Sequence, residues 1–370
     1  MRVLVTGGAG FIGSHLVDAL VRDGHTVRVL DSFDPQVHGG ARPVYLNPGA
    51  EYCEGDVRDR DAVRQALQSI EIVFHEAAVV GVGQSMYEIE RYVSANALGT
   101  AVLLDVIVND RLPIRKLMVA SSMSIYGEGQ YACPACGPVA PGLRSIEQLQ
   151  THDWELRCPR CRRQTTACPT PETKPLLPTS VYAVSKRDQE ELCLSVGRSY
   201  GIPTVALRYF NVYGTRQALS NPYTGVCAIF SARIKNANRP IVFEEGAQTR
   251  DFVHVRDIVQ ANLLAMREAR ADYGVFNVGS GAPVSIARIA ELLAELYEAP
   301  IRPDITLKYR AGDIRHCYAE IAPLTALGFR PSITLEDGLR ELVAWGRQEV
   351  AEDRVEAAAN ELEARGLTRG

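Results

Sequence analysis

The sequence lacks the features of a membrane protein and of a nucleic-acid-binding protein. No apolar run approaches the ~20 residues of a membrane-spanning helix, and the N-terminus begins an apolar strand, not a signal peptide. The net charge is −4 and no basic stripe dominates the chain, which argues against a nucleic-acid partner. With 370 residues, 46% of them apolar and 23% charged, the chain can bury a large core. We therefore expect a soluble, cytoplasmic protein of two lobes.

The N-terminus has the order strand, glycine-rich turn, helix. Residues 2–6 are a short apolar strand, Gly7, Gly8, Gly10 and Gly13 follow, and apolar residues then recur at helical spacing up to Leu20. Glycines permit a tight turn and a close backbone approach, and the N-terminus of the helix can receive a pyrophosphate. This context predicts a dinucleotide site whose cofactor contacts include Gly7, Gly10, Phe11, Ile12 and Gly13.

The second strand selects the kind of dinucleotide. It spans residues 26–30 and ends in Asp31, whose carboxylate is placed to accept hydrogen bonds from the adenosine ribose. That carboxylate would repel a 2′-phosphate, so NAD is favoured over NADP. A simple turn cap before Ser32 is the alternative role of Asp31. The next strand ends near Asp56 and Val57, which are expected beside the adenine.

Strand and helix patterns alternate along the first part of the chain, with strands at 72–75, 116–121 and 204–207 and helices near 92–108 and 182–200. We predict an α/β fold with a Rossmann-like, doubly wound parallel sheet over residues 1–213. Residues 214–348 should form mainly a smaller C-terminal substrate lobe, with part of 250–280 returning to the sheet. A final amphipathic helix is expected at 333–346, with Ile333, Leu335, Leu339, Leu342 and Trp345 as its buried side. The charged tail at 349–370 is expected to be an exposed helix or a frayed end.

Tyr182 and Lys186 are four residues apart and so share one face of a helix. A phenol becomes a useful base near neutral pH when a cation lies one helical turn away. The spacing alone is common by chance, and the isolated pair is usually a surface tyrosine beside a solvated lysine. Together with the glycine turn and with Ser122 upstream, it predicts hydride chemistry on an alcohol.

Between Ser122 and Tyr182 lies a cysteine-rich segment. Two Cys-x-x-Cys pairs are separated by 21 residues: Cys133 and Cys136, then Cys158 and Cys161. Paired knuckles of this kind are typical of a tetrahedral zinc site, and four thiolates leave no open position for catalysis. We predict a structural zinc in a small zinc-knuckle insert at 129–176, with redox thiols or unligated cysteines as the alternatives. Cys168 has no matching partner. The insert joins the segments that carry Ser122 and Tyr182, so we expect it to shape or cover the substrate pocket.

In order along the chain, these motifs resemble the extended short-chain dehydrogenase/reductases, specifically the nucleotide-sugar 4-epimerases and dehydratases. The resemblance covers about residues 1–128 and 176–345. It rests on the glycine turn, Asp31, Asp56-Val57, His75-Glu-Ala-Ala78, Asn96 before Gly99-Thr100, Ser121-Ser122-x-x-x-Tyr126-Gly127, Tyr182 with Lys186, Arg208-Tyr-Phe-Asn211-Val-Tyr-Gly214, Arg250-Asp-Phe-Val-His254-Val and Arg310-Ala-Gly-Asp313. In this family the separation between the serine and the tyrosine is usually much shorter than the 60 positions found here.

The resemblance implies a role for each of these residues. Tyr182 would take the proton of a sugar 4-hydroxyl as hydride leaves carbon 4 for NAD, and Ser122 would relay or hold that proton. Lys186 would also contact the nicotinamide ribose. Ala77, Ala78 and Asn96 join the expected cofactor contacts. Arg250 and Arg310 are expected to clamp the diphosphate of the substrate. The other expected substrate contacts are Ser122, Asn211, Asp313 and Cys317.

Two positions narrow the choice of reaction and of substrate within this family. In the 4,6-dehydratases of this family an Asp and a Glu follow the catalytic serine or threonine, whereas this chain has Met123 and Ser124. Neither residue titrates usefully, so epimerisation is favoured over dehydration. Cys317 lies near where 4-epimerases set substrate size, and a small residue there would leave room for a different sugar. A simple buried thiol is the other reading of Cys317.

The substrate and partners are also expectations from the resemblance. Residues 31–39, the insert and residues 312–317 look most like dTDP-L-rhamnose 4-epimerases, which interconvert dTDP-L-rhamnose and dTDP-6-deoxy-L-talose and would serve cell-surface polysaccharide synthesis. A UDP-glucose/UDP-galactose 4-epimerase is the main alternative. A 4-keto reductase and an NAD-binding scaffold without catalysis are further alternatives. The family usually forms homodimers through the helices at 92–108 and 182–200.

Overall fold

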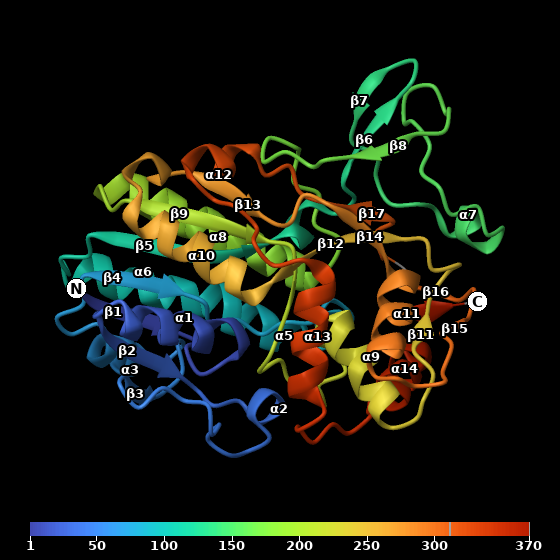
Figure 1. Ribbon diagram of the computed structural model, residues 1–370. Helices are drawn as coiled ribbons and strands as arrows, with labels where there is room; N and C mark the ends of the chain where they lie inside the picture. The colour runs from blue at the N-terminus through green and yellow to red at the C-terminus, as the bar shows by residue number, and fades with distance from the viewer. Residues whose placement is uncertain (311, 370) are drawn as a thin grey trace.

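The computed structural model describes residues 1–310 and 312–369 and centres on a seven-stranded parallel sheet (Figure 1). The order across the sheet is β13 (Val275–Val278), β9 (Thr204–Tyr209), β5 (Lys116–Ser122), β4 (Ile72–His75), β1 (Arg2–Thr6), β2 (Thr26–Asp31) and β3 (Glu51–Glu54). Helices cover both faces of the sheet, and its central strands are therefore nearly continuous apolar runs. The predicted Rossmann-like fold, including the strand returning from 250–280, is confirmed.

One apolar cluster fills each side of the sheet. On one side lie α1 (Phe11–Arg22), α10 (Val255–Arg267) and α12 (Ala322–Leu327). On the other side lie α3 (Arg60–Ala66), α6 (Gly99–Asn109) and α8 (Val181–Tyr200). Register aligns Thr6 with His75 and Ser122 with Tyr209, so the carboxyl ends of β1, β4, β5 and β9 meet at one edge. Ligands bind at this edge in open α/β sheets.

The helix predicted near 92–108 is longer and contains an irregular turn. It runs through α5 (Ile89–Tyr92), a π-helical turn η1 (Val93–Leu98) and α6. The Thr100 hydroxyl donates to the Asn96 carbonyl oxygen at 2.6 Å within this turn. An 18-residue window of this 21-residue helix has a mean hydropathy of 1.4, so the helix is long and apolar enough to cross a membrane by length and composition. Buried core helices of soluble proteins pass the same test, and this helix also contains the charged residues Glu90, Arg91 and Asp105.

A smaller lobe lies beside the carboxyl edge of the sheet. Its largest sheet joins β10 (Asn211–Tyr213), β12 (Thr249–His254) and β14 (Pro283–Ser285), and β17 (His316–Cys317) also pairs with β12. Two further strand pairs are β11 (Ile241–Val242) with β15 (Asp304–Ile305), and β16 (Tyr309–Arg310) with β18 (Thr368–Arg369). The helices of the lobe are α9 (Val226–Lys235), α11 (Ile286–Leu296), α13 (Leu335–Gly346) and α14 (Val355–Ala364).

The insert carries its own three-stranded sheet. The strand order is β7 (Gly137–Val139), β6 (Gln130–Cys133), β8 (Thr166–Cys168), and α7 (Ile146–Gln150) lies in the loop between β7 and β8. It projects from the rest of the molecule at the upper right of Figure 1. The remaining short helices are α2 (Pro35–His38), α4 (Val82–Ser85), η2 (Met123–Tyr126) and η3 (Ala269–Ala271).

Two predictions for the C-terminal region need correction. The helix expected from Ile333 begins at Leu335, because the Thr334 side chain accepts the Asp337 amide as an N-cap. Its buried side includes Val343, while Trp345 is only half-buried. The tail at 349–370 is not an exposed or frayed end over its described part, since α14 buries Ala358 and Leu362 and β18 pairs with β16.

Candidate active site

The glycine turn packs directly against the end of β4. Gly7 has a φ of +70°, and a Cβ added there would lie 2.8 Å from the Ala77 Cα. A Cβ on Gly13 would collide with the Gly7 carbonyl oxygen. Side chains at these two positions would therefore push the turn away from the sheet edge. The turn and the first residues of α1, Phe11 and Ile12, line a cavity at that edge.

Asp31 faces the same cavity from the end of β2. Its two carboxylate oxygens accept the backbone amides of Ala9 and Phe33, each at 2.9 Å. The carboxylate closes the local turn, which is the alternative role of Asp31. It also lies at the cavity wall, and its contact with a ribose stays a prediction. Asp56 and Val57 line the cavity beyond it, and Asp56 is paired with Arg58 at 2.6 Å.

Tyr182, Lys186 and Ser122 meet at the floor of the cavity. Tyr182 and Lys186 come from the first turns of α8, and Ser122 ends β5. Burial raises the pKa of the Tyr182 phenol, and a hydrogen bond with Ser122 lowers it. The Ser122 hydroxyl oxygen accepts the Ser124 amide at 3.1 Å, which caps η2 and fixes the position of Ser122.

Lys186 is held by a buried polar network below the floor. Its ammonium donates to Gln189 Oε1 at 2.8 Å, and Gln189 Nε2 donates to the Thr100 hydroxyl at 3.0 Å. The His75 ring nitrogens lie 2.8 Å from the Thr6 and Thr100 hydroxyl oxygens. Burial, followed by the charge of Lys186, lowers the pKa of His75 to about 3, so the imidazole is neutral. Burial also lowers the pKa of Lys186 to about 8.

Glu76 also lines the cavity. It belongs to the motif His75-Glu-Ala-Ala78, for which the sequence predicted no role at this position. Its carboxylate accepts the Tyr209 hydroxyl at 2.9 Å and attracts the Lys186 ammonium. Burial raises its pKa to about 7. In the sequence, the only sign that Glu76 has a function is its place as a charged residue between the apolar strand β4 and two alanines. Gln189, which fixes Lys186, lies at an ordinary helical position and gave no signal.

The other end of the cavity is lined by the two predicted arginines. Arg250 donates to the carbonyl oxygens of Thr249, Arg315 and Ile314 and to the Asp313 carboxylate at 3.2 Å, so its guanidinium is fixed in place. Arg310 lies 4.2 Å from the centre of the Phe243 ring. Asn211 also lines the cavity, and its buried Oδ1 has no hydrogen-bond partner among the described residues. These groups can bind an anionic ligand with hydrogen-bonding oxygens.

Two predicted contacts do not reach the cavity. Asn96 is fully buried, where its amide bonds the Val79 backbone and the Ser185 hydroxyl, so it supports the cavity wall from behind. Cys317 is 1% exposed in the core beside Thr170, and burial raises the pKa of its thiol to about 12. β17 pairs with β12 in a register that places Cys317 beside Arg250, and Cys317 belongs to an apolar cluster of buried residues. The buried-thiol reading of Cys317 is the one that the structure supports.

A single cavity of about 720 Å³ joins all the remaining predicted residues. It extends from the glycine turn past Tyr182 to Arg250 and Arg310, between the parallel sheet and the smaller lobe. Apart from Asn96 and Cys317, every predicted cofactor and substrate contact lines it. The arrangement can hold a dinucleotide at one end and a second anionic ligand at the other, with a buried phenol and ammonium between them.

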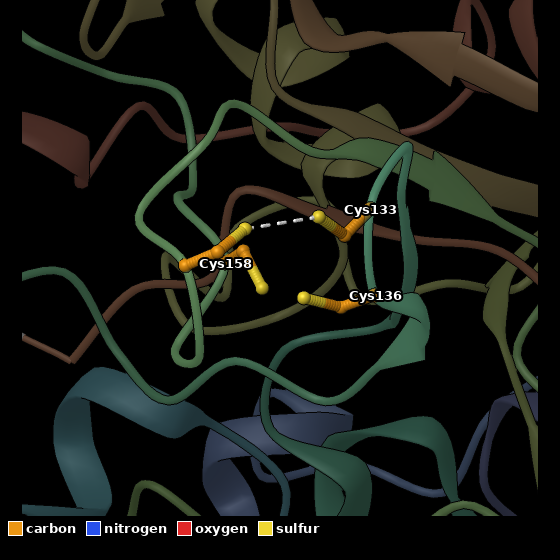
Figure 2. Close-up of side chains that lie close together, drawn as sticks. Cys133, Cys136 and Cys158 are labelled. Carbon is orange, nitrogen blue, oxygen red and sulfur yellow. Dashed lines mark hydrogen bonds between the residues drawn. The ribbon is translucent and has the colours of Figure 1, made fainter.

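The four cysteines of the insert gather as predicted. Their sulfur atoms all lie within 4.8 Å of one another, and those of Cys133 and Cys161 are 3.4 Å apart. In Figure 2 the thiols of Cys133, Cys136 and Cys158 point into one space. The backbone amides of Arg160 and Cys161 donate to the Cys158 sulfur. Cys168 lies outside the group.

The insert does not cover the cavity, contrary to expectation, since none of its residues lines the wall. Its two ends are bonded to the same segment: the Gly129 amide donates to the His316 carbonyl at 2.9 Å and the Thr170 amide to the Tyr318 carbonyl at 2.8 Å. Both connections therefore lead away from the cavity. The insert contacts the smaller lobe instead, where Glu155 pairs with the buried Arg315 at 2.6 Å. Arg144 pairs with Glu244 at 2.8 Å.

Comparison with known proteins places this site in a family. The family described as "NAD dependent epimerase/dehydratase family" matches residues 3–141 and 162–279. A dTDP-L-rhamnose 4-epimerase of Burkholderia thailandensis is 35% identical, with 94% of this chain and 96% of the relative covered. The crystal structure of a UDP-glucose 4-epimerase of Thermotoga maritima with UDP-glucose is 31% identical and has a TM-score of 0.76, covering 94% and 99% of the two chains. A UDP-glucose 4-epimerase of Thermus thermophilus in complex with NAD is 30% identical with a TM-score of 0.75, covering 95% and 100%.

We expect replacement of Glu76 by glutamine to remove a pH dependence of stability. The folded-state pKa is about 7 and the ordinary value is 4.5, so the folded protein binds more protons between these values. Wild-type stability therefore falls as the pH rises from 4.5 to 7. Glutamine does not titrate, so the stability of the variant relative to wild type should rise over this range, by about 1–3 kcal/mol, and then level off. Unfolding midpoints across this range measure the effect. A flat difference, equal to that of the exposed control Glu54→Gln, would contradict it.

Proposed function

The chain belongs to the NAD dependent epimerase/dehydratase family, and on that premise we propose that it inverts carbon 4 of a nucleotide-diphosphate sugar through a transient 4-keto sugar. The observation that carries this proposal is the single cavity in which Tyr182, Lys186 and Ser122 lie between the glycine turn and the arginine pair. NAD-bound and UDP-glucose-bound relatives of the same fold support it.

The residues of the site fit NAD at the sheet edge. The glycine turn leaves room for a pyrophosphate at the N-terminus of α1, and the Asp31 carboxylate suits ribose hydroxyls and disfavours a 2′-phosphate. Bound NAD would accept a hydride from carbon 4 and return it, so no net oxidation occurs. Because the cofactor is regenerated in each cycle, it can stay bound.

The chain itself supplies the proton transfer. Tyr182 takes the 4-hydroxyl proton in the oxidation and gives a proton back in the reduction. Burial disfavours the phenolate, so the Ser122 hydrogen bond and the nearby Lys186 ammonium are needed to stabilise it. Arg250, Arg310 and Asn211 hold the diphosphate while the 4-keto sugar presents its other face. Met123 and Ser124 line the cavity after Ser122 and provide no extra acid or base for loss of water.

For the substrate we propose dTDP-L-rhamnose, with dTDP-6-deoxy-L-talose as the product, a reaction of cell-surface polysaccharide synthesis. The Burkholderia thailandensis relative, which carries this activity in its name, supports the choice. A UDP-glucose/UDP-galactose 4-epimerase is the second candidate, supported by the Thermotoga maritima structure. A 4-keto reductase would use the same Ser122, Tyr182 and Lys186 but would consume a nicotinamide in each turnover. A non-catalytic scaffold would leave these three residues without a role.

We also propose that Cys133, Cys136, Cys158 and Cys161 bind a structural zinc ion. A tetrahedral site with Zn–S bonds of about 2.3 Å needs sulfur atoms about 3.8 Å apart, and the grouped thiols fit this with small adjustments. The insert has a small apolar core, made mainly of Tyr131, Val139 and Leu156 around the cysteines. A metal would therefore supply most of its stability.

A homodimer is proposed from the exposed apolar side of the helix pair at the cofactor domain. Ile89, Val93 and Leu98 are 53%, 43% and 51% exposed on α5 and η1, and Val184 is 44% exposed on the adjoining α8. Exposed apolar side chains on adjoining helices are typical of a protein interface. We propose a cytoplasmic location, which suits the absence of disulfides among the described residues.

The proposed reaction predicts carbon-4 inversion without added cofactor. Purified protein is incubated separately with dTDP-L-rhamnose, UDP-glucose and UDP-galactose, and NMR reads the configuration at carbon 4. Tyr182→Phe should lower kcat about 10²–10⁴-fold, because the general base is lost. Tyr200→Phe, at the exposed end of the same helix, is the control and should retain activity. Turnover that requires stoichiometric nicotinamide would indicate a reductase, and no inversion of any substrate would refute the proposal.

The zinc site predicts about one zinc per chain by elemental analysis of freshly purified protein. Cys158→Ser should remove most of the metal and make the insert more sensitive to protease, because its small core loses the metal. Cys168→Ser changes a cysteine of the same insert outside the cluster and should retain full zinc. A metal-free wild type with four reactive thiols in the cluster would exclude the site.

The dimer predicts that a double variant, Ile89→Asp with Leu98→Asp, is monomeric in light scattering, because charge on both exposed positions opposes burial of the patch. Val44→Asp, on a fully exposed residue elsewhere, should leave the mass unchanged. A wild type that already runs as a monomer would contradict the proposed interface.

A further inference from the structure

The C-terminal segment, defined here as residues 353–369, forms part of the cavity wall. Helix α14 and the residues after it contribute five apolar side chains to the same cavity that contains Tyr182 and Arg250: Val355, Ala358, Ala359, Leu362 and Leu367. The family match ends at residue 279, so this wall lies outside the part of the chain that the family defines.

Polar contacts fix the segment to the smaller lobe at both ends. At its start, the Asp353 carboxylate pairs with Arg233 of α9 at 3.2 Å, with both side chains 6% exposed, and accepts the Asn238 amide at 2.7 Å. At its end, β18 pairs antiparallel with β16, which places Thr368 opposite Arg310. The segment therefore holds the strand that carries one arginine of the proposed diphosphate clamp.

The middle of the segment reaches the cofactor domain. Leu362 packs over Gly83 of α4, where an added Cβ would lie 3.4 Å from its side chain. The Arg365 guanidinium lies 4.3 Å from the centre of the Tyr87 ring, and the Tyr87 hydroxyl lies 2.6 Å from that of Tyr223. The C-terminal segment thus crosses from one side of the cavity to the other, next to α9 and α11 in Figure 1.

The two sides of α14 differ in chemistry. Its outward side carries exposed charged or polar residues such as Glu356, Asn360 and Glu363. Its cavity side is uncharged and includes the small residues Ala358 and Ala359, which keep space open. A charged ligand group would lose hydration against such a wall, whereas an uncharged ring would not.

We propose that the C-terminal segment is the wall against which the uncharged part of the nucleotide sugar packs, beside Arg310 of the arginine pair that holds its diphosphate. The inference rests on the proposed function for the identity of the ligand. The segment then determines binding and selection of the substrate, and it leaves the proton transfer at Tyr182 unchanged.

The test compares one substitution at two positions of the same helix. Ala359→Phe places a ring in the cavity, and Ala357→Phe places it on the exposed side of α14. For the substrate that wild type inverts, Ala359→Phe should raise KM by at least about tenfold with kcat within about threefold, and Ala357→Phe should match wild type. Equal KM values for the two variants would overturn the inference.

A second pair tests the wall by removing atoms, in case Ala359→Phe fails to fold. Leu367→Ala should weaken binding of the nucleotide sugar several-fold, because apolar contact with the ligand is lost. Val350→Ala changes an 85% exposed residue before the segment and should have no effect. Wild-type affinity in Leu367→Ala would overturn the inference.

Calorimetric binding of dTDP-L-rhamnose and UDP-glucose to these variants separates the two proposals. Binding by wild type without inversion would refute the proposed reaction, and the paired variants would still test the wall through their Kd values. Inversion by all variants with unchanged Kd and KM would refute the proposed role of the C-terminal segment and would support the proposed reaction.

Discussion

The buried ammonium of Lys186 is the constraint on which the rest of the site depends. A charge in this position is costly, and burial lowers its pKa to about 8. The surrounding groups offset that cost: Gln189 accepts a hydrogen bond from the ammonium, the Glu76 carboxylate attracts it, and the nearby His75 is neutral. Behind them, Arg208 and Glu190 form a buried pair of their own at 2.5 Å. The polar side chains between β4, β5 and α8 therefore stabilise the Lys186 ammonium, which lies near the Tyr182 phenol.

The cavity owes its shape to packing between separate parts of the chain. The parallel sheet provides the cofactor side through Gly7 and Gly13, whose missing side chains allow the turn to approach Ala77. The smaller lobe provides a rigid Arg250, fixed by backbone carbonyls. The C-terminal segment closes the space between these two sides. The insert lies behind Asp313 and stiffens the lobe through Arg144 and Glu155, so its effect on the site is indirect.

Local chemistry explains which features the sequence could predict. A glycine turn after an apolar strand, a carboxylate at the next strand end, and a tyrosine and lysine one turn apart each depend on neighbouring residues, and all three lie in the cavity. The cysteine pairs are also local, and the predicted four gather. Asn96, Cys317 and the insert do not line the cavity, which the sequence did not show because motif membership does not say which way a side chain points. Cys317 is buried beside Thr170, and both ends of the insert are bonded to the backbone of residues 316–318.

The sequence by itself determined the parallel fold, the preference for NAD and the candidate residues Ser122, Tyr182 and Lys186, since these follow from local motifs: alternating strands and helices, a carboxylate at a strand end, and a tyrosine and lysine one helical turn apart. Only the tertiary structure decided the environment of these groups. The pKa of Glu76 depends on burial by residues distant in sequence, and Gln189 acts only because α8 packs against β4. The tail was expected to be exposed because its composition is polar on average. One face of α14 is nevertheless apolar, and this face lines the cavity. Burial is a property of the packed molecule, and composition alone does not contain it.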